Sequence, residues 1–514
     1  MKRPLCWGIE CLGILLAAFT IGCGGGYNNG SSGGGYGADA LMHGQYAFVA
    51  SGFEGAVAGS ITTDGQGHIT GGIDDVHAPT FAGAGTNSNN FTITSGSYSI
   101  NSNNAGTFTY KDSNGNSFTF AVALGTVSNG VASRGTIIEF DNNELVGNIP
   151  LETTGQIALQ DASAFSTSAM SGTYAFAFNG FNGGGQPNAT IGSFTASNGS
   201  FTNALFDQNS AAEEANGGAR ITSNTGFTAD FSTPVDSNGR GVVSVTGITE
   251  VGTFAVYAVS AGEWFAIDVA VDTDDYTGVI LQQTGGPFSS SSVNGSMVLQ
   301  DQFASAVNAP AAMLGLFTSG GTGSASLSYD ENNDGTVSSN QTSPSLSISF
   351  TSAANGRFTV TPQGSTSQYV GYMVASNQAV FTSTNTLGPD FGTFEPQSGG
   401  PFSSSSANGS FFFGSLAINS VPVDPTGNTP PLVFDSGVVT LSSGSLSGTE
   451  AQNSSGTLNS GSGSISGTYT VASNGRVTTN GNVVLYIVSP TKAYLLDITS
   501  NPGSYNPTIQ VFLQ

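Results

Sequence analysis

A segment of thirteen residues occurs twice in the chain, and it is one of several landmarks that repeat in a fixed order. TGGPFSSSSVNGS at 284–296 returns as SGGPFSSSSANGS at 398–410, with eleven identical positions. Glycine-led aromatic segments begin at 44, 172, 295 and 409, and a second glycine-led segment begins at 59, 192, 315 and 437. Asn-Gly-Arg occurs at 238, 355 and 474, where the first copy has Asn104-Ala105-Gly106. Tyr257, Tyr372 and Tyr486 follow at matching spacings. The constant order indicates four copies of one unit.

Each copy consists of short alternating runs broken by turn residues, without a helical apolar period. The last copy divides into eight strands at 409–416, 431–441, 444–452, 464–472, 475–480, 482–489, 492–499 and 508–514. An eight-strand meander lets its first and last strands pair, which removes exposed edges. The sequence therefore predicts an all-β tandem array of four antiparallel, eight-stranded, up-and-down barrel-like domains. Asn474-Gly475 predicts a type I′ turn between the fourth and fifth strands.

The landmarks set the expected domain boundaries. They are a leader at 1–23, a Gly/Ser-rich tether at 24–42, and β repeats at 43–165, 166–290, 291–403 and 404–514. Alternation on the opening strands assigns to the lumen Tyr46, Phe48, Tyr174, Phe176, Phe178, Phe411 and Phe413. Phe165, Phe288 and Phe402 recur at the joins, where we expect them to plug the barrels.

The N-terminus predicts export. Lys2 and Arg3 precede an apolar run at 11–22 that is too short to span a bilayer, and Thr20-Ile21-Gly22-Cys23 follows. This segment resembles the bacterial lipobox, which implies lipidation at Cys23 and anchoring at the outer membrane or cell surface. A plain secretory signal that is cleaved elsewhere is the alternative. With Cys6 and Cys11 in the leader, the mature chain would have no disulfide or Cys-ligated metal.

The charge balance limits the partners. The formal net charge is −24, and removal of Lys2 and Arg3 from the nine cations leaves seven. Seven scattered cations cannot form the basic patch that phosphate binding needs, so nucleic acid is not an expected partner. No cofactor is expected either.

Two groups of residues are candidates for catalytic or metal-binding chemistry. His43, His68 and His77 all fall in the first copy, in or beside hairpins, and we interpret them as exposed loop residues rather than a catalytic or metal cluster. Asp330, Asn332 and Asp334 match the start of a calcium loop, but Gln341 stands where a bidentate Glu is needed, so an Asn/Asp-rich turn is the simpler interpretation.

Two further features allow a binding role. If Phe265, Ile267 and Val269 face the lumen, Trp264 and Asp268 lie outside, where they could bind a sugar ring or pack on a neighbouring domain. The Arg of Asn-Gly-Arg could anchor an anion, or its stem could cover an apolar edge of the turn.

The barrels resemble the calycin group, which includes lipocalins and avidin-like proteins, in strand count and in the Gly-x-Tyr-x-Phe opening. The repeats are also similar to those of tandem-repeat lipoproteins from environmental bacteria, a resemblance that implies no catalytic residues. The sequence thus favours a non-enzymatic surface lipoprotein with a structural role or weak multivalent adhesion to a polysaccharide or other cell-surface polymer. The alternative is carriage of small apolar ligands inside the barrels, which open lumens would support and filled lumens would exclude. A hydrolase that uses His68 and His77 is a third hypothesis.

Overall fold

The computed structural model describes residues 37–514 except for 53–54, 79–85, 142–143, 146–148, 151, 183–184, 212–213, 215–219, 249–250, 271–274, 307–308, 367, 387, 417–432, 455 and 501–506. The chain divides into two compact units, Met1–Gly35 and Tyr36–Gln514. The first unit, with the predicted leader and Cys23, lies outside the described residues. The second unit is all-β and contains four tandem barrels, as predicted.

The first barrel closes in the order β1-β10-β7-β6-β5-β4-β3-β2. Its strands are β1 (His43–Gly52), β2 (Gly55–Asp64), β3 (His68–Ala78), β4 (Thr86–Ile100), β5 (Ala105–Asp112), β6 (Ser117–Ser128), β7 (Val131–Glu139) and β10 (Thr154–Leu159). Because β1 pairs with both β2 and β10, this barrel has no open edge. The short strands β8 (Glu144–Leu145) and β9 (Ile149–Pro150) pair only with each other among the described strands.

The second and third barrels have a divided fourth strand. The second consists of β11 (Gly172–Phe181), β12 (Pro187–Ser197), β13 (Ser200–Ser210), β14 (Ile221–Gly226), β15 (Thr228–Thr233), β16 (Arg240–Thr246), β17 (Thr253–Ser260), β18 (Glu263–Asp268) and β19 (Asp275–Gln282). β13 pairs with β12 along its length, with β14 near one end and with β15 near the other. β14 and β15 together therefore take the place of the first barrel's long β4.

The third barrel repeats this plan. It consists of β20 (Asn294–Ala306), β21 (Ala309–Gly320), β22 (Ser324–Asn333), β23 (Thr336–Thr342), β24 (Leu346–Ser352), β25 (Arg357–Pro362), β26 (Tyr369–Ala375), β27 (Gln378–Ser383) and β28 (Phe391–Pro396). Here β22 pairs with β21, β23 and β24.

The fourth barrel has the eight strands expected for the last copy. They are β29 (Gly409–Ser415), β30 (Val433–Ser442), β31 (Ser445–Ser454), β32 (Thr457–Val471), β33 (Arg476–Thr479), β34 (Val483–Ser489), β35 (Lys492–Asp497) and β36 (Ile509–Leu513). The predicted turn type is wrong, because only Gly475 has a positive φ, of 88°. Gly475 N donates to Ala472 O, and Ala472 N donates to Arg476 O, which describes a type I turn closed by a glycine bulge.

Four short 3-10 helices of the described residues lie outside the barrels. η1 (Ala38–Leu41) falls within the predicted tether, but it packs against the first barrel rather than standing free. Met42 is fully buried, and Asp39 Oδ1 accepts a hydrogen bond of 2.6 Å from Ile100 N. The others are η3 (Ala162–Ala164), η4 (Thr167–Ala169) and η5 (Ser290–Ser292), in the connections between barrels.

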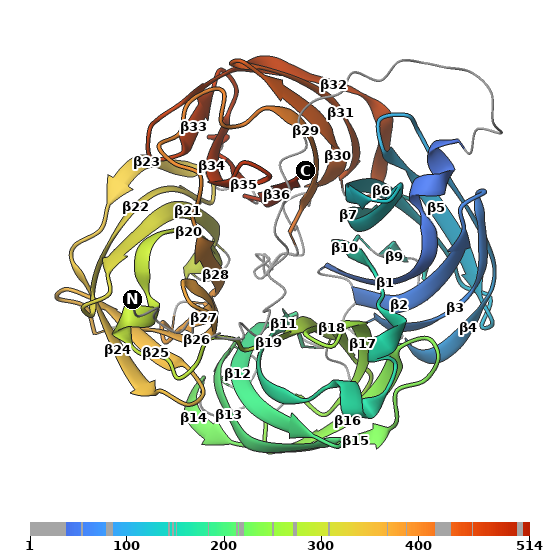
Figure 1. The fold of residues 1–514 in the computed structure, drawn as a ribbon, viewed down its shortest axis with the longest axis horizontal. Coiled ribbons are helices and arrows are strands. Elements are labelled where there is room, and N and C mark those ends of the chain that lie inside the picture. The colour runs from blue at the N-terminus through green and yellow to red at the C-terminus, as the bar shows by residue number, and fades with distance from the viewer. Residues whose placement is uncertain are drawn as a thin grey trace, which may run out of the picture. The chain divides into compact units, whose positions relative to one another are not determined.

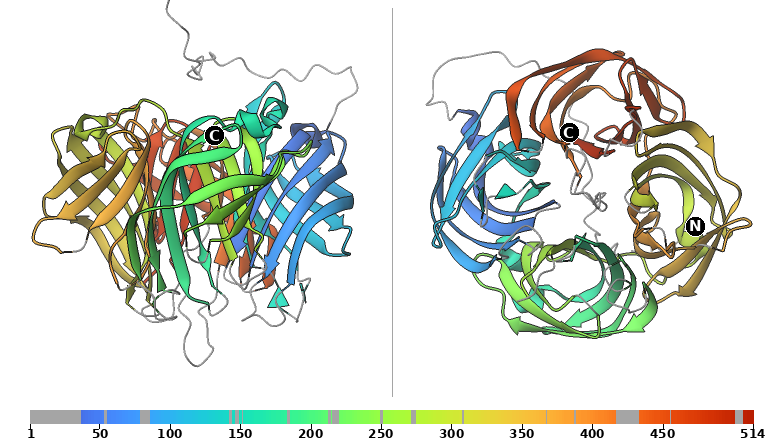
Figure 2. Two further views of the ribbon diagram at one scale, coloured as in Figure 1. Left: turned by 90° about the horizontal axis from the view of Figure 1, so that it is seen from below. Right: turned by 180° about the vertical axis from the view of Figure 1, so that it is seen from behind.

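The four barrels of this unit lie side by side in one layer, each against the next and the fourth against the first (Figures 1 and 2). The lumens hold one set of apolar residues, including the aromatic residues predicted for the opening strands. A second set fills the interfaces between barrels: β1, β2 and β10 meet β17 and β18, for example, through a cluster that includes Ala47, Val49, Phe265 and Ile267. Strands at these interfaces are therefore buried on both faces.

The predicted Phe plugs pack under the Asn-Gly-Arg turns. Phe288 and Phe402 belong to the cores of the third and fourth barrels, and Phe165 packs against the core of the second. A Cβ at Gly356 would lie 2.7 Å from Cδ2 of Phe288. The turn glycine, which also has φ of 69°, thus has both a conformational and a steric reason to be glycine.

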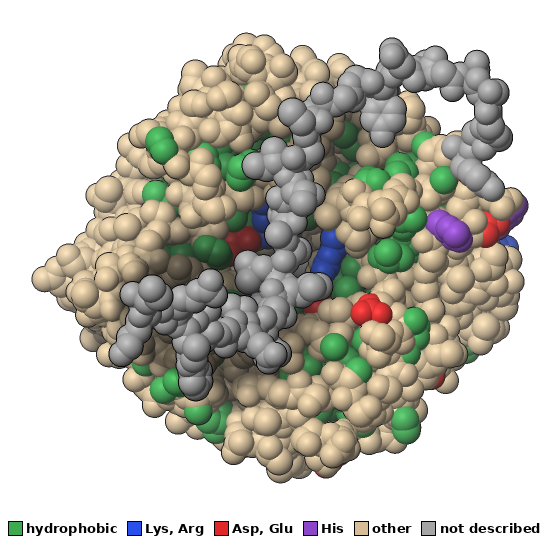
Figure 3. Space-filling view, viewed as in Figure 1, with side chains coloured by type: hydrophobic (Ala, Val, Ile, Leu, Met, Phe, Trp, Pro, Cys, Tyr) green, Lys and Arg blue, Asp and Glu red, His purple; other side chains and the backbone are tan. Residues whose placement is uncertain are grey.

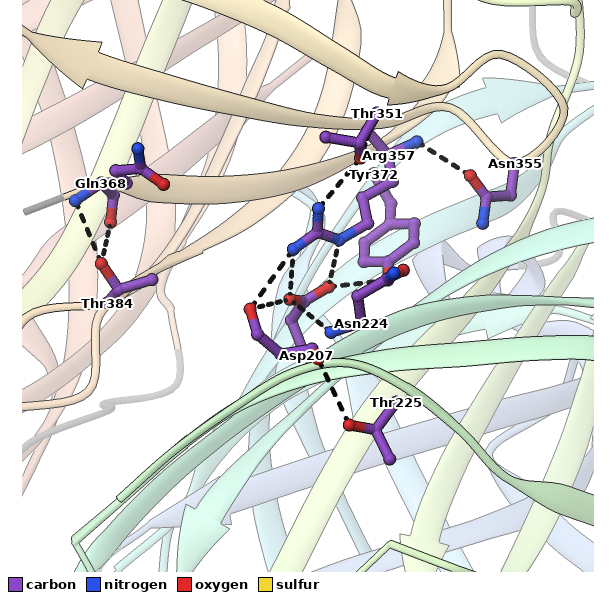
Figure 4. A network of polar contacts seen from close by, with 10 residues as sticks. Asp207, Asn224, Thr225, Thr351, Asn355, Arg357, Gln368, Tyr372 and Thr384 are labelled. Carbon is purple, nitrogen blue, oxygen red and sulfur yellow. Dashed lines mark hydrogen bonds and ion pairs between the residues drawn. The ribbon is translucent and has the colours of Figure 1, made fainter. Parts of the chain in front are cut away.

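The Arg of each Asn-Gly-Arg reaches the preceding barrel rather than covering an apolar edge. Arg357 on β25 donates from Nε and Nη2 to both oxygens of Asp207 on β13, at 2.8 and 2.7 Å, and Tyr372 OH donates to Asp207 Oδ2 at 2.7 Å (Figure 4). The backbone N of Asn224, a residue with positive φ, donates to the same carboxylate. Asp207 and Arg357 are 3% and 7% exposed, so this is a buried bidentate ion pair.

The same Asp–Arg–Tyr triad, which Asp207, Arg357 and Tyr372 form here, occurs at two further interfaces. Arg240 and Tyr257 of the second barrel bind Asp75 of the first, and Arg476 and Tyr486 of the fourth bind Asp330 of the third. A recurring Gln adds a second link: Gln160, Gln283 and Gln397 each donate from Nε2 to two backbone carbonyls of the next barrel, one of them that of the Asn in Asn-Gly-Arg.

The interface between the fourth and first barrels lacks the triad at all three positions. The strand registers place Ala451, Ala105 and Ala123 where the other interfaces have Asp, Arg and Tyr. The contacts here are apolar, with Phe412 and Val438 packed against Ala123. Hydrogen bonds to backbone carbonyls, such as Thr136 Oγ1 to Phe413 O at 2.8 Å, complete the interface.

Candidate ligand sites in the barrel lumens

Two lumens contain a cavity. The cavity in the third barrel has a volume of about 260 Å³, and that in the fourth has a volume of about 410 Å³. Apolar side chains of the barrel strands form most of both walls, and carboxylates line part of each. Both cavities approach or reach the size range of small-molecule sites in proteins.

The size of the side chains on the fifth and sixth strands explains why the first lumen is filled. Phe108 and Phe120 of the first barrel stack at 5.1 Å, and Tyr110 and Phe118 extend the same cluster. At the place of Phe108 the later barrels have Val243, Val360 and Thr479, and at the place of Phe120 they have Phe254, Tyr369 and Val483. The fourth barrel has the smallest side chains at both places, and its cavity is larger than that of the third barrel.

The second lumen is filled by a different set of rings. Phe178 stacks on Phe254 at 4.5 Å, and Phe194 stacks on Phe201 at 4.3 Å. Trp264 belongs to the same core and is fully buried. At the places of Phe178, Phe201 and Trp264 the third barrel has the smaller side chains of Asp301, Ala325 and Ala379.

The cavity in the third barrel has an acidic wall. Asp301 of β20 and Glu331 of β22 line it together with Tyr329 and Tyr369. Burial raises the pKa of Asp301 well above its usual range, and the nearby carboxylates of Asp390 and Glu331 raise it further. Burial also raises the pKa of Glu331, and it raises that of Asp390 to about 7.

The cavity in the fourth barrel is lined by a carboxylate, Asp435, that accepts hydrogen bonds from side chains of the same barrel. Asp435 Oδ1 accepts from Gln452 Nε2 and Oδ2 accepts from Gln510 Nε2, both at 2.9 Å. Glu450 lines the same cavity, and burial, aided by Asp435, raises its pKa to about 7. Asp435 is therefore satisfied within the fourth barrel, whereas neither carboxylate oxygen of Asp301 accepts a hydrogen bond.

A further cavity of about 270 Å³ lies between the barrels and is lined by residues of all four. Two ion pairs connect barrels in addition to those of Arg240, Arg357 and Arg476: Arg134 pairs with Glu263, and Lys492 Nζ donates to Glu395 Oε2 at 2.9 Å. On the face in Figure 3, Lys, Arg, Asp and Glu side chains are visible around the hollowed centre, whereas most of the surrounding surface is uncharged. Gln156, Gln300 and Gln302 contribute polar side chains to the wall of this central space.

The predicted outward position of Trp264 is wrong. Its indole lies in the lumen of the second barrel, where Nε1 donates to Ala261 O, and Phe265 and Ile267 face the first barrel instead. Asp268 is fully buried and accepts a hydrogen bond from Ala270 N. Neither side chain is exposed, so neither can contact a polymer at the surface. The alternation was assigned to the wrong face because both faces of β18 are apolar.

The residues of the calcium-loop match have structural contacts. Asp330 binds Arg476 and Tyr486, and Asn332 donates from Nδ2 to Asp497 O and Thr499 O of the fourth barrel. Asp334 lies in the turn between β22 and β23, whereas Asp330 and Asn332 lie within β22, so the Asn/Asp-rich turn interpretation holds for Asp334 alone. Within the described part of the chain, no group of three or more His, Cys, Asp or Glu could hold a metal ion.

The histidines do not all lie in exposed loops. His68 is exposed and pairs with Asp64 at 2.7 Å, whereas His77 is fully buried in β3, opposite to expectation. Burial lowers the pKa of His77 to about 4, so it is neutral near pH 7. His77 occupies the register position of Asn209, Asn332 and Asn453, whose amides each bind backbone carbonyls of the neighbouring barrel.

Sequence reasoning missed the lumen carboxylates and the partners of the Asn-Gly-Arg arginines. Asp301 has no counterpart in the other copies, so repetition could not identify it. Asp207 and Asp330 do recur at one alignment position, but Asp75 lies one residue further along its copy. In the strand pairing Asp75 lies opposite Ala58, the register position at which Asp207 lies opposite Ile191.

No helix in the described ranges is long and apolar enough to cross a membrane. No model of a known protein family matches the chain, and no curated protein matches it. Among solved structures, one similar chain is the isotype 1 transferrin binding protein B from serogroup B Neisseria meningitidis, at 12% sequence identity and a TM-score of 0.18. The match covers 74% of this chain and 84% of that chain. A TM-score this low leaves fold and function to be argued from the chain itself.

Proposed function

We propose that the protein is a lipid-anchored, non-enzymatic protein of the bacterial cell surface that binds small molecules with apolar bodies in the lumens of its third and fourth barrels. The observation that supports this proposal is the pair of cavities, of about 260 and 410 Å³, at places that rings fill in the first two barrels. Burying an apolar ligand in such a space releases about 25 cal/mol per Å² of surface removed from water.

The difference between the barrels favours ligand carriage over a purely structural or adhesive role. Four equally filled barrels would be sufficient for a structural or adhesive array. Large-to-small changes that leave a void inside a core are destabilising, by about 24 cal/mol per Å³ in a well-studied series. An unfilled lumen therefore has a cost that ligand binding would offset. The lipid at Cys23, suggested by the lipobox resemblance, would hold the barrels at the membrane, and the outer membrane is the expected site.

Two substitutions test the proposal by placing in the third or fourth lumen a Phe that other barrels have at the same position. Leu299 in the third barrel stands where the other barrels have Phe48, Phe176 and Phe413, so Leu299→Phe fills that lumen with a residue the fold accepts. Val483→Phe does the same in the fourth, where the first two barrels have Phe120 and Phe254.

The measurement is a binding screen of fluorescent fatty acids and aromatic probes on residues 36–514, which form a compact unit of their own. We expect saturable binding that each substitution lowers by at least tenfold at its own site. Val127→Phe is the matched control, because it adds the same ring at an exposed position of the first barrel. Absence of saturable binding, or binding that both lumen variants retain, would refute ligand carriage. The structural or adhesive role would then be the better explanation.

A further inference from the structure

One lumen position distinguishes the third barrel from the other three. Counted along the opening strands by their register, this position holds Ala50, Phe178, Asp301 and Ser415 in turn. Asp301 is fully buried, and neither of its carboxylate oxygens accepts a hydrogen bond. A buried polar group without any partner is uncommon in a folded protein, and a bound ligand is one way to satisfy it.

The protein supplies no cation to this carboxylate. Six of the seven cations beyond the leader pair elsewhere: Arg134, Arg220, Arg240, Arg357, Arg476 and Lys492 bind Glu263, Glu214, Asp75, Asp207, Asp330 and Glu395. The seventh, Lys111, lies on β5 of the first barrel. A positive charge next to Asp301 would therefore have to come from outside the chain.

The rest of the cavity suits a cation with an apolar body. Glu331 offers a second carboxylate in the same wall. The rings of Phe317, Phe358, Phe381, Phe394, Tyr329 and Tyr369 also line the space. Aromatic faces attract cations, by about 2 kcal/mol or more when the pair is removed from water.

We propose that the lumen of the third barrel binds a small amphipathic amine, whose ammonium group donates to the Asp301 carboxylate and whose apolar body fills the cavity. This inference rests on the proposed function and specifies the ligand class for one of its two sites. An ammonium group has three donors and no acceptor, so it can satisfy Asp301 and Glu331 together. The fourth lumen, where Gln452 and Gln510 already satisfy Asp435, is not expected to share this preference.

Binding of the amine should release a proton. The titratable groups that face Asp301 are Glu331, Asp390, Tyr329 and Tyr369, none of them basic; Arg220, whose charge acts on Asp390, pairs with Glu214. The empty site therefore favours the neutral acid, whereas the bound ammonium favours the carboxylate. Calorimetry in buffers of different ionisation enthalpy measures the number of protons released.

The test compares 2-phenylethylamine with 2-phenylethanol and 3-phenylpropanoate, which share a ring but differ in charge. Titrations of residues 36–514 use the wild type, Asp301→Asn, Asp301→Ser and Leu299→Phe. Ser is the residue that the fourth barrel has at this position. Asp435→Asn serves as the matched control, because it alters a lumen carboxylate of the fourth barrel.

We expect the amine to bind at least tenfold more tightly than the alcohol, with release of a proton, and the carboxylate probe to bind most weakly. Asp301→Asn and Asp301→Ser should remove the preference for the amine while the alcohol still binds. Leu299→Phe should remove binding of both the amine and the alcohol. Asp435→Asn should change neither the amine affinity nor the alcohol affinity. Equal affinity for amine and alcohol in a site that Leu299→Phe blocks would overturn this inference and leave the proposed function standing. If no probe binds at a site that Leu299→Phe blocks, the amine site is refuted, and the screen of the fourth barrel decides the proposed function separately.

Discussion

Asp74 shows how a single buried acid affects the stability of the first barrel. It faces the lumen at the register position of Phe206 and Tyr329, and its carboxylate is fully buried. Burial, followed by the charges of Asp112 and Asp75, raises its pKa to about 8 from an ordinary value of 3.8. The folded state therefore holds a proton on Asp74 at pH values where the unfolded chain has released it.

The sign of the resulting pH dependence follows from linkage. Because the folded pKa is raised, the contribution of Asp74 to stability is fully present below about pH 4 and is lost as the pH rises toward 8. Asp74→Asn removes this loss, so we expect the variant to be more stable than the wild type at pH 8 by about 2–5 kcal/mol and nearly equal to it at pH 4. Thermal unfolding followed by circular dichroism at pH 4, 6 and 8 measures the difference.

Asp64→Asn is the opposite case and serves as the control. Asp64 is an acid whose pKa hydrogen bonds from Gln66 N, His68 N and the His68 ring lower to about 2, so its contribution is lost on acidification, not on alkalinisation. A wild type and an Asp74→Asn variant with the same pH profile would show that Asp74 does not titrate in this range.

At the scale of strands, the sequence was informative where one face meets solvent and misleading where both faces are buried. The expected strands of the last copy match β29–β36 to within a few residues, because turn residues separate their alternating runs, except that β32 begins at Thr457 rather than at 464. Trp264 on β18 was assigned to the wrong face, because Phe265 packs on the neighbouring barrel as closely as Trp264 packs in the lumen. A ligand cavity has no sequence period, so the lumens could be recognised as open or filled only once the strands were in register.

The Asp–Arg–Tyr triad gives the next prediction, at the interface between the second and third barrels. Arg357→Met leaves Asp207 buried without its ionic partner, which we expect to cost about 3–5 kcal/mol of unfolding free energy. Asp207→Leu/Arg357→Met removes both charges and should recover most of that loss. Urea unfolding followed by the fluorescence of Trp264, the one Trp in residues 36–514, reports on the second barrel directly.

Arg134→Met provides the comparison for this experiment. The side chains of Arg134 and Glu263 are 31% and 20% exposed, so water screens their ion pair and its loss should cost roughly 1 kcal/mol or less. If Arg357→Met costs no more than Arg134→Met, or if the double variant is the least stable of the set, the triad does not stabilise the interface.

For the whole molecule, the distribution of triad residues among the copies determines which barrels become neighbours. The first copy has the Asp but not the Arg, and the fourth has the Arg but not the Asp. Each Arg therefore binds an Asp one copy earlier, and the fourth barrel meets the first without this ion pair, through apolar contacts and hydrogen bonds such as Asn453 Nδ2 to Glu139 O. The sequence contained this information, but the one-residue offset of Asp75 concealed it.

The closing interface allows a last prediction. A Cβ at Gly125 would lie 1.8 Å from Cδ1 of Phe412, so Gly125→Ala overfills the contact between the first and fourth barrels. We expect a loss of about 1–3 kcal/mol on thermal unfolding, the usual cost of overpacking. Phe412→Ala also destabilises alone, because it leaves a cavity between the barrels.

The combination distinguishes contact from independent damage. In Gly125→Ala/Phe412→Ala the new methyl occupies space that the ring has left, so the double variant should be more stable than the sum of the two single losses implies. Such coupling requires that the two residues touch across the closing interface, although they lie in the first and last barrels of the chain. Strictly additive losses would mean that the fourth barrel does not pack on the first in solution.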